Sequence, residues 1–174
     1  YLSTYLVETC TQNNLRDSGY IRLVVTRGEG DLGLNPLKCP NPTIFAITQY
    51  IQMYPQKAYE NGLEVLLADT HRMSARSLDP SVKSLNYLNN ILAKLEANKA
   101  GCEEAIMRDT DGYIAECTGD NFFAVFDDAI YTPTGRDCLK GITREIVKHI
   151  CEREGMRYDA NDIHTRTWVN AKEV

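Results

Sequence analysis

Residues 139–144 (LKGITR) form a candidate anion-binding turn. Gly141 lets the backbone turn into a helix, which we expect over residues 143–154, and the first amides of a helix have no partner within it. The N–H groups of Ile142 and Thr143, together with the Thr143 hydroxyl, therefore make a ready site for an anion.

Two further segments each carry a charged residue that could act with this turn. Residues 82–87 (VKSLNY) place Lys83 just before an expected helix. Residues 112–122 (GYIAECTGDNF) place Glu116 at the end of an expected strand that runs into a loop of small residues. Each signal is weak alone, because a lysine near a loop is usually a solvated surface charge and a glutamate after a strand is usually a surface or capping residue.

A glycine-rich stretch fits a nucleotide-binding pattern but lacks the structure that the pattern needs. Residues 28–33 (GEGDLG) match G-x-G-x-x-G and follow an expected strand. Binding a pyrophosphate in this way requires a helix N-terminus directly afterwards. Pro36, Pro40 and Pro42 forbid a helix of useful length there. We therefore interpret this stretch as a loop near a binding cleft.

The composition excludes several classes of function. The chain has 174 residues, of which 43% are hydrophobic, so global disorder is excluded. Its 19 basic and 24 acidic residues give a net charge of −5, which argues against nucleic acid or an anionic membrane as the main partner. No apolar run is long enough for a membrane span, and the first residues show no signal-peptide pattern. We expect a cytoplasmic protein.

The cysteines and histidines indicate neither a disulfide scaffold nor a metal site. The six cysteines are scattered without any C-x-x-C pair, so we expect reduced, mostly buried thiols. The three histidines lie far from one another and from any paired cysteines. We therefore predict no metal.

The pattern of apolar residues predicts an α+β chain in two parts. We expect a helix over residues 2–15, strands over residues 20–27, 43–51, 63–69, 104–108, 113–116, 122–126 and 129–131, a turn or short helix over residues 54–62, and helices over residues 84–100 and 143–154. Hairpin turns are expected at Asp111-Gly112 and Asp127-Asp128. Weak periodicity over residues 71–82 indicates an interdomain connection, which gives a small domain over residues 1–78 and a large domain over residues 79–174.

In this order, the motifs resemble those of fold type IV pyridoxal-phosphate enzymes, and within that group the branched-chain amino acid aminotransferase family. The matching stretches are residues 20–36 (YIRLVVTRGEGDLGLNP), 82–97 (VKSLNYLNNILAKLEA), 112–125 (GYIAECTGDNFFAV) and 141–145 (GITRE). The resemblance implies two domains with mixed and antiparallel sheets and flanking helices. It also implies that the chain is incomplete at both ends, and the family's phosphate-binding arginine has no counterpart here.

The resemblance implies that pyridoxal 5′-phosphate is the cofactor. Lys83 would carry the cofactor aldehyde on its ε-nitrogen and later move the substrate α-proton. Glu116 would face the pyridine nitrogen and favour its protonated form. Ile142 and Thr143 would hold the phosphate.

Four further residues are given roles by the same resemblance. Tyr87, expected one helical turn after Lys83, would lie near the phenolic oxygen of the cofactor, and Leu139 would pack against the ring. Tyr20 and Arg22 share one face of a strand and would contact substrate carboxylate groups. For Arg22 a structural ion pair is the alternative.

The implied activity is transfer of an amino group from L-leucine, L-isoleucine or L-valine to 2-oxoglutarate, giving 2-oxo acids and L-glutamate. D-amino acid aminotransferases share the KSLN segment, but Glu29 and Asp31 stand where we expect further basic residues in those enzymes. Aminodeoxychorismate lyases are another relative of the same fold. A non-catalytic fragment that binds no cofactor is the alternative from a different class. The family also implies a homodimer or a larger homo-oligomer.

Overall fold

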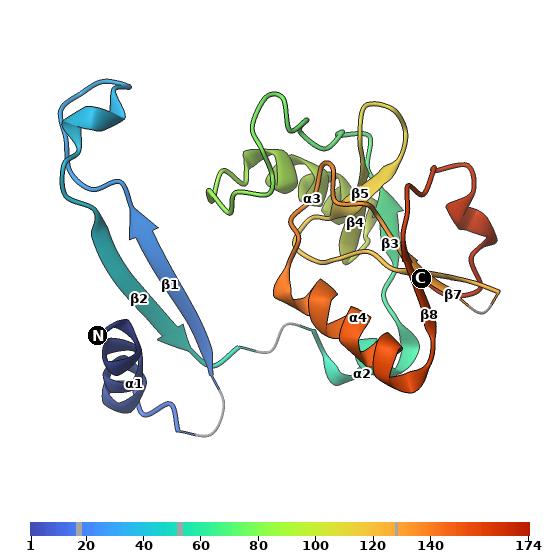
Figure 1. Cartoon of the computed structure of the whole chain (residues 1–174), viewed down its shortest axis with the longest axis horizontal. Coiled ribbons are helices and arrows are strands. Elements are labelled where there is room, and N and C mark those ends of the chain that lie inside the picture. The colour runs from blue at the N-terminus through green and yellow to red at the C-terminus, as the bar shows by residue number, and fades with distance from the viewer. Residues whose placement is uncertain (17–18, 52–53, 128) are drawn as a thin grey trace. The chain divides into compact units, whose positions relative to one another are not determined.

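The computed structural model describes residues 1–16, 19–51, 54–127 and 129–174. The chain divides into two compact units, Tyr1–Glu60 and Asn61–Val174 (Figure 1). Within the described residues, no helix has both the length and the apolar character needed to cross a membrane. All six cysteines are free, as their spacing predicts, but only Cys138 and Cys151 are buried, so the expectation that most of the thiols are buried is wrong.

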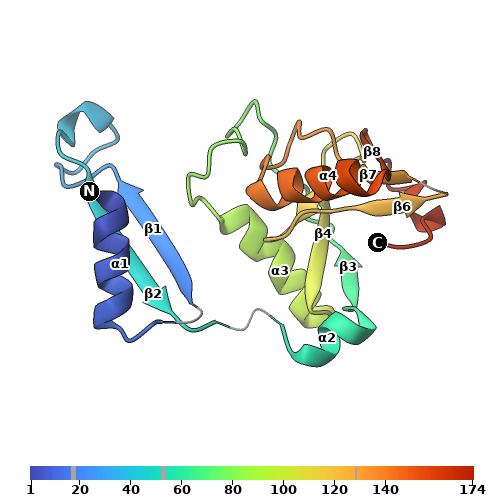
Figure 2. The ribbon, with the colours of Figure 1, turned by 60° about the horizontal axis from the view of Figure 1, so that its bottom comes forward.

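Unit 1 is a helix beside a two-stranded antiparallel sheet. Strand β1 (Tyr20–Thr26) pairs with β2 (Thr43–Gln49) in a register that runs from Tyr20 opposite Gln49 to Thr26 opposite Thr43. Helix α1 (Leu2–Gln12) contacts β2 and runs beside the sheet (Figure 2). Four of the seven residues in each strand are β-branched, a composition that favours strands.

The glycine-rich loop joins β1 to β2 and is no nucleotide-binding motif. After it the chain makes only a three-residue 3-10 helix, η1 (Pro36–Lys38), as the prolines predict. Gly28 has φ +92°, and a Cβ there would come within 1.7 Å of the Asn41 carbonyl oxygen. Only glycine fits this close approach of two backbone segments.

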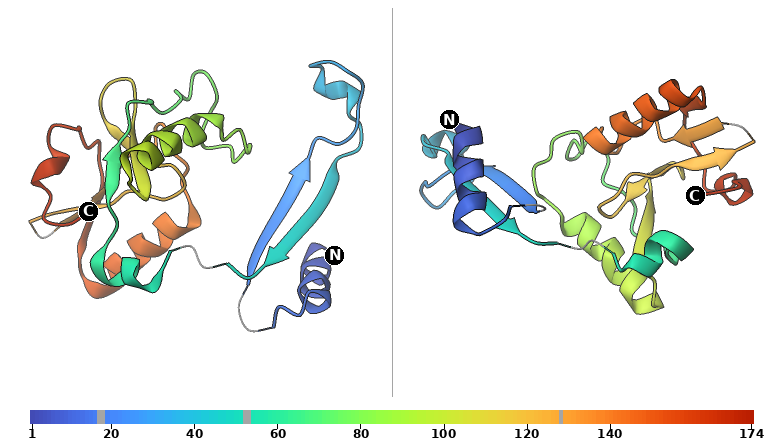
Figure 3. Two further views of the ribbon diagram at one scale, coloured as in Figure 1. Left: turned by 180° about the vertical axis from the view of Figure 1, so that it is seen from behind. Right: turned by 90° about the horizontal axis from the view of Figure 1, so that it is seen from below.

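Unit 2 begins with a three-stranded sheet in the order β3-β4-β5. Strand β3 (Val65–Leu67) runs parallel to β4 (Glu104–Arg108), and β4 runs antiparallel to β5 (Ile114–Cys117). Helix α3 (Leu88–Ala100) lies in the crossover between the parallel strands and contacts both (Figure 3).

A second three-stranded sheet has the order β6-β7-β8. Strand β6 (Ala124–Phe126) is antiparallel to β7 (Ala129–Thr132), which runs parallel to β8 (Arg157–Ala160). Helix α4 (Ile142–Glu154) connects this parallel pair and contacts β8. A short helix, α2 (Gln56–Asn61), precedes β3, and a 3-10 turn, η2 (Trp168–Asn170), lies near the end of the chain. Both sheets are mixed, as expected.

Strand β4 separates two hydrophobic clusters because its residues alternate between its two faces. One cluster joins α3 to the first sheet and consists of Ala68, Ala93, Ala97, Ala105 and Met107. Its four alanines let the helix approach the strands closely. The other cluster lies on the opposite face and consists of Ile106, Ile114, Phe122, Ala124 and Ile163. This double burial fixes the position of β5, which carries Glu116.

Several predicted boundaries differ from the structure. The helix expected over residues 84–100 begins at Leu88, and the strand expected over residues 122–126 begins at Ala124. The sequence pattern does not predict strand β8, because RYDA has no strong apolar pattern. Asp128 of the expected Asp127-Asp128 turn lies outside the described residues.

The division into units also differs from the expected domain boundary between residues 78 and 79. The units meet after Glu60, since β3 pairs with β4 and so belongs to the sheet of unit 2. Residues 71–82, expected as a connection, are tied to the same sheet by the Arg72 N–H, which donates to the Arg108 carbonyl at 2.7 Å.

Candidate active site

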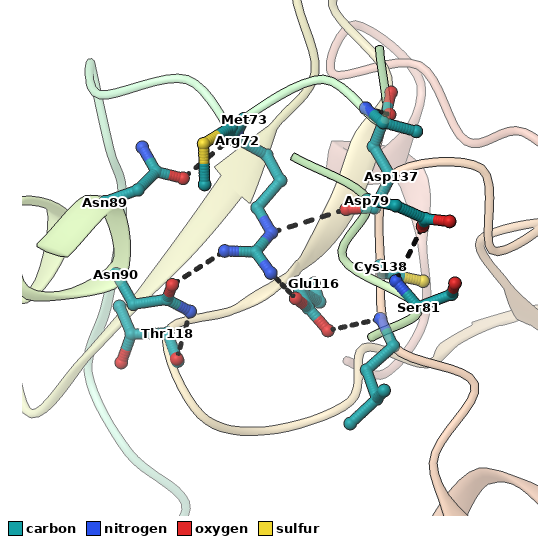
Figure 4. Close-up of polar contacts among 12 residues, drawn as sticks. Arg72, Met73, Asp79, Ser81, Asn89, Asn90, Glu116, Thr118, Asp137 and Cys138 are labelled. Atoms are coloured by element: carbon teal, nitrogen blue, oxygen red, sulfur yellow. Dashed lines mark hydrogen bonds and ion pairs between the residues drawn. The ribbon is translucent and has the colours of Figure 1, made fainter. Parts of the chain in front are cut away.

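Glu116 is a buried carboxylate held by donors on both of its oxygens. It lies on β5, and its Oε1 is 2.7 Å from Nη2 of Arg72. Its Oε2 accepts a hydrogen bond of 3.1 Å from the Leu139 N–H (Figure 4). Burial raises the pKa of the Glu116 carboxyl above its usual value, while the charge of Arg72, the Leu139 N–H and the charge of Lys83 oppose this rise.

The guanidinium of Arg72 is fixed by three groups from different parts of unit 2. Besides its ion pair with Glu116, Nη1 donates to Oδ1 of Asn90 at 2.7 Å, and Nε donates to the Asp137 carbonyl at 3.3 Å. The side chain is only 9% exposed. A planar guanidinium with such partners has one orientation available to it.

Lys83 lies in a loop rather than next to a helix start. The loop is folded by short-range hydrogen bonds, from the Ser84 N–H to the Val82 carbonyl at 2.7 Å and from the Tyr87 N–H to the Leu85 carbonyl at 2.9 Å. Leu85 has φ +66°, a left-handed conformation that is unfavourable for a leucine. Lys83 itself is exposed.

Tyr87 is the residue before α3 and caps that helix with its backbone. The expectation that Tyr87 lies one helical turn after Lys83 is therefore wrong. The left-handed backbone at Leu85 interrupts the helix that the apolar spacing predicts.

Four of the six predicted cofactor-binding residues line one hollow in unit 2. They are Lys83, Tyr87, Glu116 and Leu139. Arg72, Asn90 and Thr118 also line it. The hollow therefore combines an amine and a phenol at its exposed side with a buried, oriented carboxylate.

Ile142 and Thr143 are the first two residues of α4, which follows the turn at Gly141 and begins at Ile142 rather than at the expected Thr143. Within the described residues no side chain caps this helix, and Ile142 and Thr143 are exposed. Their N–H groups can therefore bind an anion. The hollow is lined by Leu139 but not by these two residues, so their role as phosphate ligands stays a prediction.

Tyr20 and Arg22 lie on β1 in unit 1. The Arg22 guanidinium carbon is 5.9 Å from the centre of the Tyr20 ring, as expected for neighbours on one face of a strand. Their part in substrate binding stays a prediction.

Two cysteines near Glu116 are poor nucleophiles. Burial raises the pKa of the Cys117 thiol to about 12 and that of the Cys138 thiol to about 11. Negative charge on Glu116 contributes to both of these raised values, with burial as the larger cause. At neutral pH both side chains are therefore neutral thiols, and Lys83 and Glu116 remain the candidates for chemistry in the hollow.

The structure thus places an amine and an anchored carboxylate around one hollow of unit 2. A family profile described as amino-transferase class IV matches residues 1–174. The chain belongs to this family.

Curated relatives bear names of two related activities. The chain is 49% identical over 152 residues to a Methanocaldococcus jannaschii protein named "Putative branched-chain-amino-acid aminotransferase", covering 87% of this chain and 51% of that protein. It is 34% identical over 174 residues to a D-alanine aminotransferase of Bacillus licheniformis, covering 99% of this chain and 59% of that protein. The chain thus spans about half the length of the curated relatives it matches.

Solved structures agree with this assignment. A T.th. branched-chain amino acid aminotransferase, complexed with N-(5′-phosphopyridoxyl)-L-glutamate, has a TM-score of 0.84 and 30% identity over 95% of this chain and 53% of that one. The branched-chain aminotransferase of Thermoproteus uzoniensis, solved with norvaline, has a TM-score of 0.89 and 27% identity over 98% of this chain and 57% of that one.

Sequence reasoning did not find Arg72 or Asn90. Arg72 lies in the segment interpreted as an interdomain connection, where a basic residue is expected to be solvated. The available signal was a single arginine shortly after the apolar strand residues of LEVLLAD. Asn90 lies among the polar residues of an amphipathic helix and gives no signal of its own.

Proposed function

We propose that the whole protein transfers the amino group of L-leucine, L-isoleucine or L-valine to 2-oxoglutarate, with pyridoxal 5′-phosphate as cofactor. The observation that carries the proposal is that Lys83 and Glu116 line one hollow in a chain of the class IV family. The names of the curated relatives and of the solved structures favour branched-chain substrates.

The carboxylate of Glu116 fits the cofactor's ring nitrogen. Pyridoxal phosphate, when bound, supplies an electron sink for the negative charge that develops at the substrate α-carbon. Each Glu116 oxygen receives one donor in the structure, from Arg72 or from Leu139, and a carboxylate has about four lone-pair sites. Glu116 therefore keeps acceptor capacity for a protonated ring nitrogen, and its negative charge would favour that protonated form.

Lys83 is the residue that would hold the cofactor covalently. Its exposed ε-amine lies at the same hollow as Glu116, so one bound molecule could reach both. Once a substrate amine takes its place, the free ε-nitrogen would move a proton from the substrate α-carbon. Tyr87 and Leu139 would fix the ring in the hollow, and the start of α4 would hold the phosphate.

Substrate recognition would alternate between an aliphatic side chain and a carboxylate. Arg22 would grip a carboxylate with two parallel hydrogen bonds, with Tyr20 beside it. The whole protein would assemble as a homodimer or larger homo-oligomer and act in the cytoplasm.

Transamination of D-amino acids is the second candidate. The likeness to the Bacillus licheniformis D-alanine aminotransferase supports it, because it extends over 99% of this chain. Aminodeoxychorismate lyase activity and a fragment without cofactor are further outcomes that an experiment can distinguish.

The test is to supply the whole protein and pyridoxal phosphate with 2-oxoglutarate and either L-leucine or D-alanine. We expect L-glutamate to form with L-leucine only, and we expect Lys83→Ala to abolish this turnover. Turnover of D-alanine alone would establish the second candidate. Release of pyruvate from aminodeoxychorismate would establish the lyase, and absence of any visible absorption from bound cofactor would favour the inert fragment.

A further inference from the structure

Asn90 links the residue that anchors Glu116 to the loop that follows Glu116. It lies in the first turn of α3 and is 7% exposed. Its Oδ1 accepts the hydrogen bond of 2.7 Å from Nη1 of Arg72, and its Nδ2 donates to the Thr118 carbonyl at 2.7 Å. Figure 4 shows Asn90 on the opposite side of the guanidinium from Asp137. Both polar atoms of this buried amide thus have partners.

The neighbouring Asn89 holds the backbone on both sides of Arg72. Its Oδ1 accepts from the Met73 N–H at 3.0 Å, and its Nδ2 donates to the His71 carbonyl at 2.8 Å. The first turn of α3 therefore fixes Arg72 twice. Asn89 fixes its main chain, and Asn90 fixes its guanidinium.

We propose that Asn90 is a positioning residue, which sets the orientation of the Arg72 guanidinium and thereby holds the Glu116 carboxylate in place to face a ligand in the hollow. The inference rests on the proposed function, since it gives Glu116 a ring nitrogen to face. It goes beyond that function by assigning a role to a residue that would not touch the cofactor.

The neutrality of the Asn90 amide is central to this role. An amide oxygen occupies one side of the guanidinium without adding negative charge, so it does not compete as a second carboxylate with Glu116 for the charge of Arg72. A carboxylate in the same place would share Arg72 and would lie near Glu116, and two neighbouring carboxylates disfavour each other's ionisation. Asn90→Asp has nearly the same shape and adds a charge beside the guanidinium, but it also removes the hydrogen bond to the Thr118 carbonyl, a loss that Asn90→Ala shares without the charge.

The groups that face Glu116 come from several elements. Arg72 follows β3 and Lys83 lies in the loop before α3, and both carry positive charge toward Glu116. Cys117 on β5 and Cys138 before α4 lie near it as neutral thiols. Replacing Asn90 leaves all four in place, so a changed titration of Glu116 reports on Arg72 and on any charge introduced at position 90.

The experiment follows the Glu116 side-chain carboxyl by 13C NMR across pH in the whole protein without cofactor, with Glu116→Gln to assign the signal. We expect Asn90→Asp to raise the titration midpoint by about one pH unit. Asn89→Asp is the matched control, because it adds the same charge on the same turn but contacts the backbone rather than the guanidinium. For the control we expect a rise of less than about 0.3 unit.

Two further measurements keep the inference falsifiable. If Asn90→Asp does not fold, Asn90→Ala removes the amide without adding charge and is expected to raise the midpoint in the same direction by a few tenths of a unit. With pyridoxal phosphate added, the pH dependence of its visible absorption should shift in Asn90→Asp and not in Asn89→Asp.

The outcomes separate this inference from the proposed function. Equal midpoints for Asn90→Asp and Asn89→Asp, or an unchanged midpoint in Asn90→Ala, would reduce Asn90 to a packing residue and overturn the inference. A shifted midpoint in a protein that never binds the cofactor would support the role of Asn90 toward Glu116 and contradict the proposed function alone.

Discussion

Arg72 and Glu116 form a buried ion pair with 2.7 Å between Nη2 and Oε1, and the pair spans a sheet. Arg72 follows β3 and Glu116 lies on β5, with β4 between these strands. Removing two charges from water costs about as much free energy as their attraction returns, so such a pair defines position more than it adds stability. The pair thus fixes where the negative charge of the hollow lies.

Removing the cation should destabilise the fold in a pH-dependent way. Arg72→Met leaves Glu116 buried without its partner, and we expect the free energy of unfolding at pH 8 to fall by about 3 kcal/mol. At pH 5 the loss should be smaller, because the uncompensated carboxylate can then bind a proton. Urea unfolding at both pH values measures this, and an equal loss at both would contradict the ion pair's importance.

The raised pKa of Glu116 should itself be visible in stability. A raised pKa means that the folded state binds this proton more tightly than the unfolded chain does, so stability is lost as pH rises from the ordinary value of 4.5 through the folded pKa. We expect the wild-type free energy of unfolding, relative to that of Glu116→Gln, to fall over this window. The contributions of the other carboxylates are the same in both proteins and cancel in this comparison. A difference in unfolding free energy that stays constant across the window would contradict the raised pKa of Glu116.

The left-handed backbone at Leu85 should respond to the shape of the side chain. β-Branched residues are least compatible with φ +66°, whereas glycine adopts it freely. We expect Leu85→Val to be less stable than Leu85→Gly by about 1–2 kcal/mol. Thermal unfolding checks the order, and the reverse order would show that Leu85 is not strained.

The loop of unit 1 offers a matched pair of glycine variants. A Cβ at Gly28 would come within 1.7 Å of the Asn41 carbonyl oxygen, whereas a Cβ at Gly33 would meet only Asp31 Oδ1 at 3.8 Å. We expect Gly28→Ala to cost about 2 kcal/mol or more and Gly33→Ala to be nearly neutral. Susceptibility of the loop to limited proteolysis should rise in the first variant only; similar cleavage of both would contradict the close approach.

Much of the fold follows from local pattern, and its exceptions have physical causes. The prolines at positions 36, 40 and 42 exclude a nucleotide-binding helix, and the glycines at 141 and 155 mark the two ends of α4. The expected start of α3 at residue 84 is wrong because the spacing of apolar residues does not indicate the left-handed backbone at Leu85. Strand β8 depends on pairing with β7 rather than on its own composition.

Some residues of the candidate site can be predicted from sequence motifs, and others are found only from tertiary contacts. Lys83, Glu116 and Leu139 stand in motifs and could be named from the sequence, and the structure brings them to one hollow. Arg72 and Asn90 act only through contacts between segments that are far apart in the chain. Arg72 lies 2.7 Å from Glu116, and Asn90 accepts a hydrogen bond of 2.7 Å from Arg72. Such partners carry no local signal.

The central claim is that the cofactor attaches to Lys83. The direct measurement is borohydride reduction of the whole protein with pyridoxal phosphate, followed by peptide mapping by mass spectrometry. We predict a single phosphopyridoxyl label on the peptide that contains Lys83, and its loss in Lys83→Ala. A label on Lys94 or Lys140 in place of Lys83, or a label that persists in Lys83→Ala, would contradict the account.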